Sequence, residues 1–432
     1  MKIPSQSIPQ NWAVRFFAIW TGQAFSLFGS ALVQFALVWW LTQKTGSATI
    51  LATATLAGML PQIVLGPFAG ALVDRWNRRL IMILADASIA LSTLLLAYLF
   101  AIGKVEIWHV FAIMAARSLG GAFHFPAMSA STPLMVPEKH LTRIGGLNQT
   151  LMGLMNMIAP PVGALLITVL PTQGVLFIDI GTAALAIVPL FFLNIPQPER
   201  LVTSSPAEKT SLLTDVRAGL TYVRSWPGLV AILFMALFLN FLLTPTGALM
   251  PLLITKFFGR GALEFGLMDS AWGFGVIAGG ILLGIWGGFK KKVVTSMLGI
   301  IGIGIGVSLV AFAPANLFPL ALAGMAFAGV ANPIANGPLG ALLQTIVRKD
   351  MQGRVMSLVN SGATAMTPLG LLIAGPVSDV IGIRSWFWIA GVITLIMGLA
   401  GFFMPIVMNV ENNHSNEDAS HLNRQPVIGA TE

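Results

Sequence analysis

The sequence predicts an all-α membrane protein in which twelve transmembrane helices form two six-helix, pseudo-symmetric bundles. Of the 432 residues, 56% are hydrophobic and 9% are charged, whereas a soluble protein carries about 25% charged residues because its surface contacts water. The chain also divides into twelve long apolar windows, and its two halves repeat each other. The windows are 16–42, 47–73, 80–102, 107–133, 144–170, 174–195, 228–255, 265–288, 293–313, 317–346, 355–378 and 385–409.

The loops between these windows are short. A helix crosses a membrane with about 20 mostly apolar residues, so twelve spans use roughly 240 residues and leave no room for a large soluble domain. Two boundaries lie in uncharged stretches and depend on helix-breaking residues. These are Pro171 and Gly174 between the fifth and sixth spans, and Pro314 and Pro319 between the ninth and tenth.

An internal repeat divides the chain into halves. Pro126 in the fourth span aligns with Pro333 in the tenth, and residues 136–143 align with residues 347–354. Two six-helix halves in the same orientation follow from this repeat. Parallel repeats of this kind are a transporter architecture, in which the substrate site lies between the halves near the membrane midplane.

The predicted domains follow the same division. Residues 1–195 form the N-terminal bundle and residues 228–410 the C-terminal bundle. Between them, the linker 196–227 contains a predicted amphipathic helix, because apolar residues recur in it at helical spacing. The tail 411–432 is polar and is expected to be disordered.

Charge and composition set the topology and exclude several functions. Placing both termini in the cytoplasm puts most Lys and Arg residues in inner loops, as the positive-inside rule requires. The net charge of +8 is therefore a topology signal, and we expect no nucleic-acid partner. Because the chain has no Cys, disulfides, thiolate metal sites and a cysteine nucleophile are excluded. The segment 1–12 has no signal-peptide pattern, so the first span is expected to remain as an anchor.

The loop after the second span carries a specific motif. Gly70 can let another helix approach closely, and Asp74 can pair with a cation or cap a helix N-terminus. The pattern Gly70-x-x-x-Asp74-Arg75-x-x-Arg78-Arg79 resembles the signature loop of the major facilitator superfamily. The resemblance implies that these residues latch the two halves together in the outward-open state. For Arg78 and Arg79, positive-inside anchoring alone is an equal alternative.

The fourth span contains Arg117, a charge inside the membrane and therefore a functional-site hypothesis. The run Arg117-Ser-Leu-Gly120-Gly121 resembles the second signature of proton-coupled antiporters, which implies a role in proton coupling and a close helix contact at Gly121. His124 and Met128 share a helical face with Arg117. The alternatives are a structural ion pair for Arg117 and a hydrogen-bonded packing role for His124.

Four acidic residues lie in spans or at their ends: Asp86, Asp179, Asp269 and Asp379. A carboxyl group in the membrane can exchange protons, which coupling to a proton gradient requires. The predicted proton-coupling set is Arg117, Asp86, Asp269 and His124, and it does not include Asp179 or Asp379. Each carboxylate can alternatively reach water near the lipid headgroups.

Several spans carry polar stripes that predict a substrate cavity, because such faces must contact protein or water rather than lipid. The alternative is hydrogen bonding between helices without a cavity. A neutral lining with methionines suits amphiphilic ligands better than sugars or ions. The predicted lining is Gln23, Ser26, Ser30, Gln34, Met128, Gln149, Asn156, Asn240, Thr244, Trp272, Asn332, Asn336, Asn360 and Thr364.

Over nearly the whole chain, the order of motifs resembles the macrolide-efflux branch of bacterial drug:proton antiporters. The matching stretches are 20–27, 41–48, 117–127 and 353–358, and residues 159–164 loosely match an antiporter signature. The resemblance implies export of macrolide-like or other amphiphilic drugs, driven by proton antiport through alternating access. It also implies a location in the bacterial cytoplasmic membrane, with the lipid bilayer as surroundings, and function as a monomer without a cofactor.

Other functional classes fit the sequence less well. An ATP-driven pump needs a phosphate-binding Gly-Lys-Ser/Thr loop, which the sequence lacks. No catalytic or metal-binding constellation is present, so an enzyme is not expected. A channel would not explain the repeat and the latch. The remaining alternative is an exporter of an endogenous metabolite, such as a siderophore or a lipid-like compound.

Overall fold

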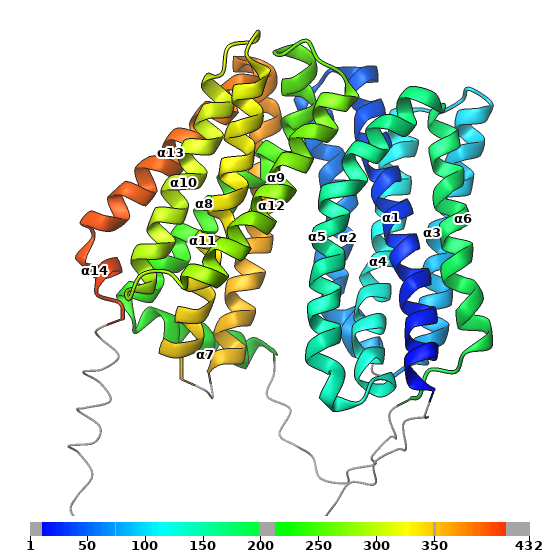
Figure 1. Ribbon diagram of the computed structural model, residues 1–432, viewed down its shortest axis with the longest axis horizontal. Coiled ribbons are helices and arrows are strands. Elements are labelled where there is room, and N and C mark those ends of the chain that lie inside the picture. Colours follow the sequence, from blue (N-terminus) through cyan, green and yellow to red (C-terminus); the bar gives the residue numbers. More distant parts are fainter. Residues whose placement is uncertain (1–10, 74, 198–211, 349–350, 412–432) are drawn as a thin grey trace, which may run out of the picture. The chain divides into compact units, whose positions relative to one another are not determined.

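The structure is a computed structural model that describes residues 11–73, 75–197, 212–348 and 351–411. Over these residues every regular element is an α-helix (Figure 1). The helices are α1 (Trp12–Thr45), α2 (Ala48–Val73), α3 (Arg78–Ala101), α4 (Ile107–Met135), α5 (Glu138–Val169), α6 (Thr172–Phe192), α7 (Leu212–Arg224), α8 (Pro227–Lys256), α9 (Ala262–Trp286), α10 (Lys292–Phe312), α11 (Phe318–Ile346), α12 (Gln352–Ile381), α13 (Ile383–Phe403) and α14 (Pro405–Met408).

Within the described ranges, eleven helices are long and apolar enough to cross a membrane, which agrees with the predicted fold class. The twelfth predicted span, 107–133, corresponds to α4. This helix has 29 residues, which is sufficient length, but its apolar run is interrupted by Arg117 and His124. Large apolar side chains such as Phe192 and Phe403 are exposed on the spanning helices, as contact with lipid requires.

Proline sets several helix ends. Pro171 is the N-cap of α6, and Pro319 lies in the first turn of α11, so both predicted boundaries in uncharged stretches are confirmed. The last span was predicted to reach residue 409, but α13 ends at Phe403 and Pro405 begins the separate helix α14. The reason is that proline has no backbone N–H and cannot continue the hydrogen-bond ladder of the preceding helix.

The internal repeat is visible in the helix bounds. Helices α4 and α11 both have 29 residues, and their starts, Ile107 and Phe318, are separated by the same offset as residues 136 and 347. Helices α6 and α13 both have 21 residues and show this offset again. The alignment of 136–143 with 347–354 has the same offset as these helix bounds. The pairing of Pro126 with Pro333 is wrong by about one helical turn, because the common offset places Pro126 opposite Gly337 instead.

The chain forms two compact units, of which unit 1 takes residues from both predicted halves and unit 2 only from the linker and the C-terminal half. Unit 1 comprises Met1–Ser204, Gly247–Gly273 and Leu371–Arg384. Unit 2 comprises Ser205–Thr246, Phe274–Gly370 and Ser385–Glu432. Unit 1 thus adds the end of α8, the start of α9 and the end of α12 to helices α1–α6.

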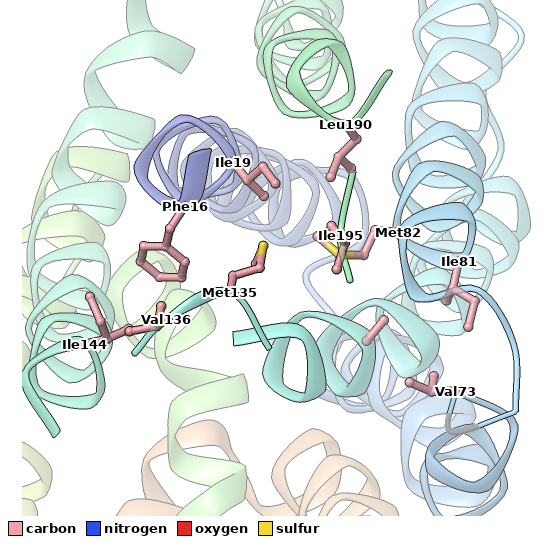
Figure 2. Close-up of a cluster of buried hydrophobic side chains, with 11 residues drawn as sticks. Phe16, Ile19, Val73, Ile81, Met82, Met135, Val136, Ile144, Leu190 and Ile195 are labelled. Carbon is pink, nitrogen blue, oxygen red and sulfur yellow. The ribbon is translucent and has the colours of Figure 1, made fainter. Parts of the chain in front are cut away.

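A cluster of buried apolar side chains lies at one end of helices α1–α6, the end at which the basic loops connect them (Figure 2). It includes Phe16 of α1, Met82 of α3 and Leu190 of α6, each 0% exposed. Burying a side chain of this size contributes about 1.5–3 kcal/mol. The cluster therefore fixes one end of the bundle, and the polar residues described below lie farther along the same helices.

The amphipathic helix predicted in the linker is confirmed as α7 (Leu212–Arg224). The part of the linker before α7, residues 198–211, lies outside the described residues. Within unit 2, Gly219 packs near Arg354, and the Tyr222 hydroxyl accepts a hydrogen bond of 3.3 Å from the Arg348 backbone N–H. Helix α7 therefore supports the connection between α11 and α12.

The close packing of α9 on α11 in unit 2 gives a first testable prediction. A Cβ atom at Gly279 would overlap the Val330 backbone carbonyl, whereas a Cβ at the neighbouring Gly280 would meet no described atom within 4 Å. Gly279→Ala should therefore lower the free energy of unfolding by about 1–3 kcal/mol, as overpacking does. Thermal unfolding in detergent, followed by tryptophan fluorescence, measures the effect.

The matched control is Gly280→Ala on the same helix. Because its new methyl group would meet open space, we expect no loss of stability, or a small gain from the higher helix propensity of alanine. Equal melting temperatures for the two variants would contradict the close contact between α9 and α11.

Candidate functional site

Two buried polar layers lie inside unit 1, on the same three helices. Each helix contributes two polar residues that are seven positions apart, which is two helical turns or about 10.5 Å. These pairs are Gln23 and Ser30 on α1, Asp86 and Thr93 on α3, and Arg117 and His124 on α4. We call the layer with Arg117 the arginine layer and the layer with His124 the histidine layer.

The arginine layer is centred on Asp179 of α6, which is 0% exposed. Its Oδ2 lies 2.5 Å from Nη1 of Arg117 and accepts a hydrogen bond of 3.0 Å from the Thr93 hydroxyl. Its Oδ1 accepts a bond of 3.1 Å from the Ser30 hydroxyl. Four helices therefore meet at one carboxylate. Removing one partner of such a buried pair typically costs about 3–5 kcal/mol, because the other charge is left unpaired.

The histidine layer is centred on Asp86 of α3, which is 3% exposed. The Gln23 amide donates a hydrogen bond of 2.9 Å to Asp86 Oδ2. Nε2 of His124 lies 3.4 Å from Oδ1 of the same carboxylate, but it makes no hydrogen bond to any described residue, and neither does Oε1 of Gln23. Asp86 is thus less completely bonded than Asp179, and it lies beside a side chain that can carry a proton.

The structure regroups the predicted proton-coupling set. It brings Asp86 and His124 together, but it pairs Arg117 with Asp179, which the sequence prediction left out. Asp269 lies on α9 and has no hydrogen-bond or ion-pair partner among the described residues. Counting how far each polar residue lies from the start of its helix could have identified Asp179 as the partner of Arg117. Arg117 and Asp179 lie 10 and 7 positions from the starts of α4 and α6, and the long arginine side chain covers the difference.

The two arginines of the predicted latch bind the neighbouring helices of the N-terminal bundle. Arg78 is 7% exposed and donates a bond of 2.7 Å to the Ala130 carbonyl of α4. Arg79 donates bonds of 2.6 Å to the Phe191 carbonyl and to Oδ1 of Asn194. The last carbonyls of a helix lack internal partners, and a cation there is favourable. Arg79 therefore joins α3 to the end of α6, and Arg78 joins α3 to α4 five residues before that helix ends.

The other latch residues give less information. Asp74 lies outside the described residues, and Arg75 is exposed. A Cβ atom at Gly70 would meet no described atom within 4 Å. The same is true of Gly121, so the expected close contact at that residue is wrong. The tight position is Gly120, where a Cβ atom would come within 2.7 Å of Ile89 of α3.

The stretch that resembles an antiporter signature joins α5 to the start of α9 within unit 1. Pro161 has no backbone N–H, so the Met157 carbonyl one turn earlier loses its helical partner. The hydroxyl of Ser270 on α9 donates a hydrogen bond of 2.9 Å to this carbonyl. The prolines of α5 therefore expose a backbone acceptor that a second helix uses.

The predicted cavity residues fall into two groups, one in each unit. In unit 1, Ser26 is buried, Met128 and Trp272 are partly buried, and Gln34, Gln149 and Asn156 are exposed. In unit 2, the side chains of Asn240, Asn336 and Thr364 hydrogen-bond backbone carbonyls one turn earlier in their own helices. Asn332 and Thr244 are partly buried, and Asn360 is exposed.

Comparison with known proteins places this arrangement in a family. Macrolide efflux protein A of Streptococcus pyogenes is 34% identical over 391 residues, which cover 90% of this chain and 95% of that protein. The multidrug efflux pump Tap of Mycolicibacterium fortuitum is 27% identical, with coverage of 87% and 92%. A bacterial homologue of the human lysosomal transporter Spinster has the same fold, with a TM-score of 0.71, 13% identity and coverage of 94% and 98%.

The family model of the Major Facilitator Superfamily matches residues 19–257 and 230–430. These ranges include both polar layers and all but the first few residues of the twelve predicted spans. The chain therefore belongs to the major facilitator superfamily, a family of membrane transporters.

Proposed function

We propose that this transporter exports macrolide-like or other amphiphilic drugs across the cytoplasmic membrane of a bacterium, by proton antiport and alternating access. The observation that carries the proposal is the pair of carboxylates, Asp86 and Asp179, buried in membrane helices and placed beside a histidine and an arginine. The substrate class is supported by the names of the relatives, a macrolide efflux protein and a multidrug efflux pump.

Proton coupling follows from the chemistry of the two layers. A proton on Asp179 would cancel its attraction to Arg117, and the guanidinium would then have to find another partner or move. A proton on His124 would create an ion pair with Asp86 across the present 3.4 Å separation. Each protonation thus changes contacts between α4 and its neighbours. Such a change can bias the equilibrium between two conformations of the transporter. Asp269 is a further proton-coupling candidate on α9.

The substrate would bind to the neutral polar residues that the sequence prediction identified on α1, α5, α8, α11 and α12, with Met128 and Trp272. Amides, hydroxyls, a thioether and an indole can contact amphiphilic compounds of different shapes, because none of them requires a charged partner. This composition favours a drug over a siderophore, since an anionic siderophore would call for several cations in the cavity.

We further propose that both termini lie in the cytoplasm, in line with the positive-inside rule. The basic loops of Arg75, Arg78 and Arg79 then face the cytoplasm, and Asp74 and Gly70 complete a latch on that side. The connections between α1 and α2, and between α8 and α9, lie at the outer ends of the helices. Because one chain carries both halves of the repeat, we propose that it works as a monomer.

The first test is drug accumulation. Efflux-deficient bacteria that express the chain should accumulate several-fold less of a labelled macrolide than cells with an empty vector. A protonophore should abolish the difference, and so should Asp74→Asn at an equal protein level. Unchanged accumulation across a panel of amphiphiles would instead favour an endogenous metabolite as the substrate.

The second test concerns the arginine layer. In inverted membrane vesicles with an imposed pH gradient, Asp179→Asn should reduce macrolide uptake by a factor of ten or more, because asparagine cannot carry the proton. Macrolide exchange without a gradient should be retained, since exchange needs no net proton transfer. This contrast separates loss of coupling from loss of folding.

Ser92→Ala is the control, because Ser92 lies beside Thr93 but its hydroxyl bonds a carbonyl of its own helix. Gradient-driven uptake by Ser92→Ala should match that of the unaltered protein. If Asp179→Asn also retained full gradient-driven uptake, proton coupling would have to be assigned to another group, such as Asp86.

A further inference from the structure

A carboxylate near the end of the chain binds the start of a helix near its beginning. Asp379 lies in the last turn of α12, and its Oδ1 accepts a hydrogen bond of 2.7 Å from the Ala48 backbone N–H of α2. Its Oδ2 accepts bonds of 2.9 Å from the Thr49 backbone N–H and of 2.9 Å from the Ser47 hydroxyl. Both segments belong to unit 1.

The contact uses groups that a helix leaves without partners. The first N–H groups of a helix have no internal acceptor, and a negative charge there is favourable because of the helix dipole. Such caps usually come from a residue just before the helix. Helix α2 already has a local cap, because the Ser47 hydroxyl accepts a bond of 3.3 Å from the Ile50 N–H. Asp379 adds a second, charged cap from the other end of the chain.

The backbones of α12 and α2 also approach closely at this point. Gly375 lies one turn before Asp379, and a Cβ atom there would come within 2.9 Å of the Thr49 Cα and 3.1 Å of the Ala52 side chain. Gly375 and Asp379 therefore form one contact face, in which the glycine permits the approach and the carboxylate holds it.

The start of α9 makes a different kind of contact within the same unit. Phe265 stacks on Phe35 of α1 with 4.7 Å between the ring centroids, and Ser270 binds the free carbonyl of α5. These contacts involve no charge. The contact of Asp379, by contrast, involves a charged group. Because Asp379 is exposed, water can replace its hydrogen-bond partners when the helices separate. The contact can therefore break and re-form at low cost, as a gate contact must.

We infer that Asp379 is a clamp that holds the outer end of α12 against α2 while the outer side of the transporter is closed, and that it must release before that side opens. The inference rests on the proposed alternating access and topology. Alternating access in this class of transporter moves one six-helix repeat against the other, so a bond between α2 and α12 has to break in every cycle.

The test measures the distance between the two helix ends by pulsed electron paramagnetic resonance. Because the chain has no native cysteine, spin labels can be placed on Gln43→Cys and Val380→Cys, two exposed positions beside the contact. In lipid nanodiscs without substrate, Asp379→Asn should raise the ratio of long to short distances by about tenfold, as expected for lost charge-assisted hydrogen bonds. Asp379→Glu, which keeps the charge, should restore most of the short distance.

The matched control is Glu264→Gln. Glu264 is also an acidic residue at the outer end of a helix, but it binds the backbone N–H of Gly261, which is close to it in the chain. This variant should leave the distances unchanged. If Asp379→Asn lowered only the melting temperature and left the distances unchanged, Asp379 would be an ordinary helix cap and the clamp would be refuted.

The experiment also separates the clamp from the proposed function, because it uses no substrate. A distance change in a protein that does not transport macrolides would support the clamp and contradict the drug assignment. Proton-driven macrolide export with unchanged distances would support the drug assignment and refute the clamp.

Discussion

The ion pair between Arg117 and Asp179 is the constraint on which the N-terminal helices depend. A charged side chain in the membrane is unfavourable unless it is paired and hydrogen-bonded, and here the pairing draws α1, α3, α4 and α6 to one carboxylate. The apolar cluster around Phe16 packs the other end of the same helices. The positions of these helices relative to one another are thus set by polar bonds at the level of Asp179 and by apolar packing at the level of Phe16.

The ion pair between Arg117 and Asp179 also bears on the proposed transport mechanism. A purely structural ion pair and a proton-coupling ion pair look alike in a single structure. They differ in what happens to the pair when one of its groups binds a proton. Asp179 is completely bonded, whereas Asp86 has an unbonded histidine nitrogen beside it. The two layers therefore differ in how completely their carboxylates and neighbours are hydrogen-bonded, although they lie on the same helices two turns apart.

Much of the fold could be predicted from the sequence because the membrane imposes simple rules of length, apolarity and charge. Proline marked the helix ends at Pro171, Pro319 and Pro405 because it has no backbone N–H to donate, although α4 and α5 continue through internal prolines. The partner of Asp379 could not be predicted in this way, whereas the depths of Arg117 and Asp179 along α4 and α6 do point to that pair. Asp379 meets the start of α2, and no local pattern specifies a contact between opposite ends of the chain. The cavity residues were predicted from their helical register. Asn240 and Thr364, however, hydrogen-bond backbone carbonyls of their own helices. Helical register alone cannot distinguish such a residue from one that faces a ligand.

The common offset between α4 and α11, and between α6 and α13, allows the two copies to be compared position by position. Opposite Arg117, His124 and Asp179 stand Ala328, Ala335 and Ala390, all of them buried. A methyl group can neither accept nor release a proton. The two copies of the helical framework are thus unequal: at these positions the first copy carries titratable side chains and the second carries buried alanines that serve packing.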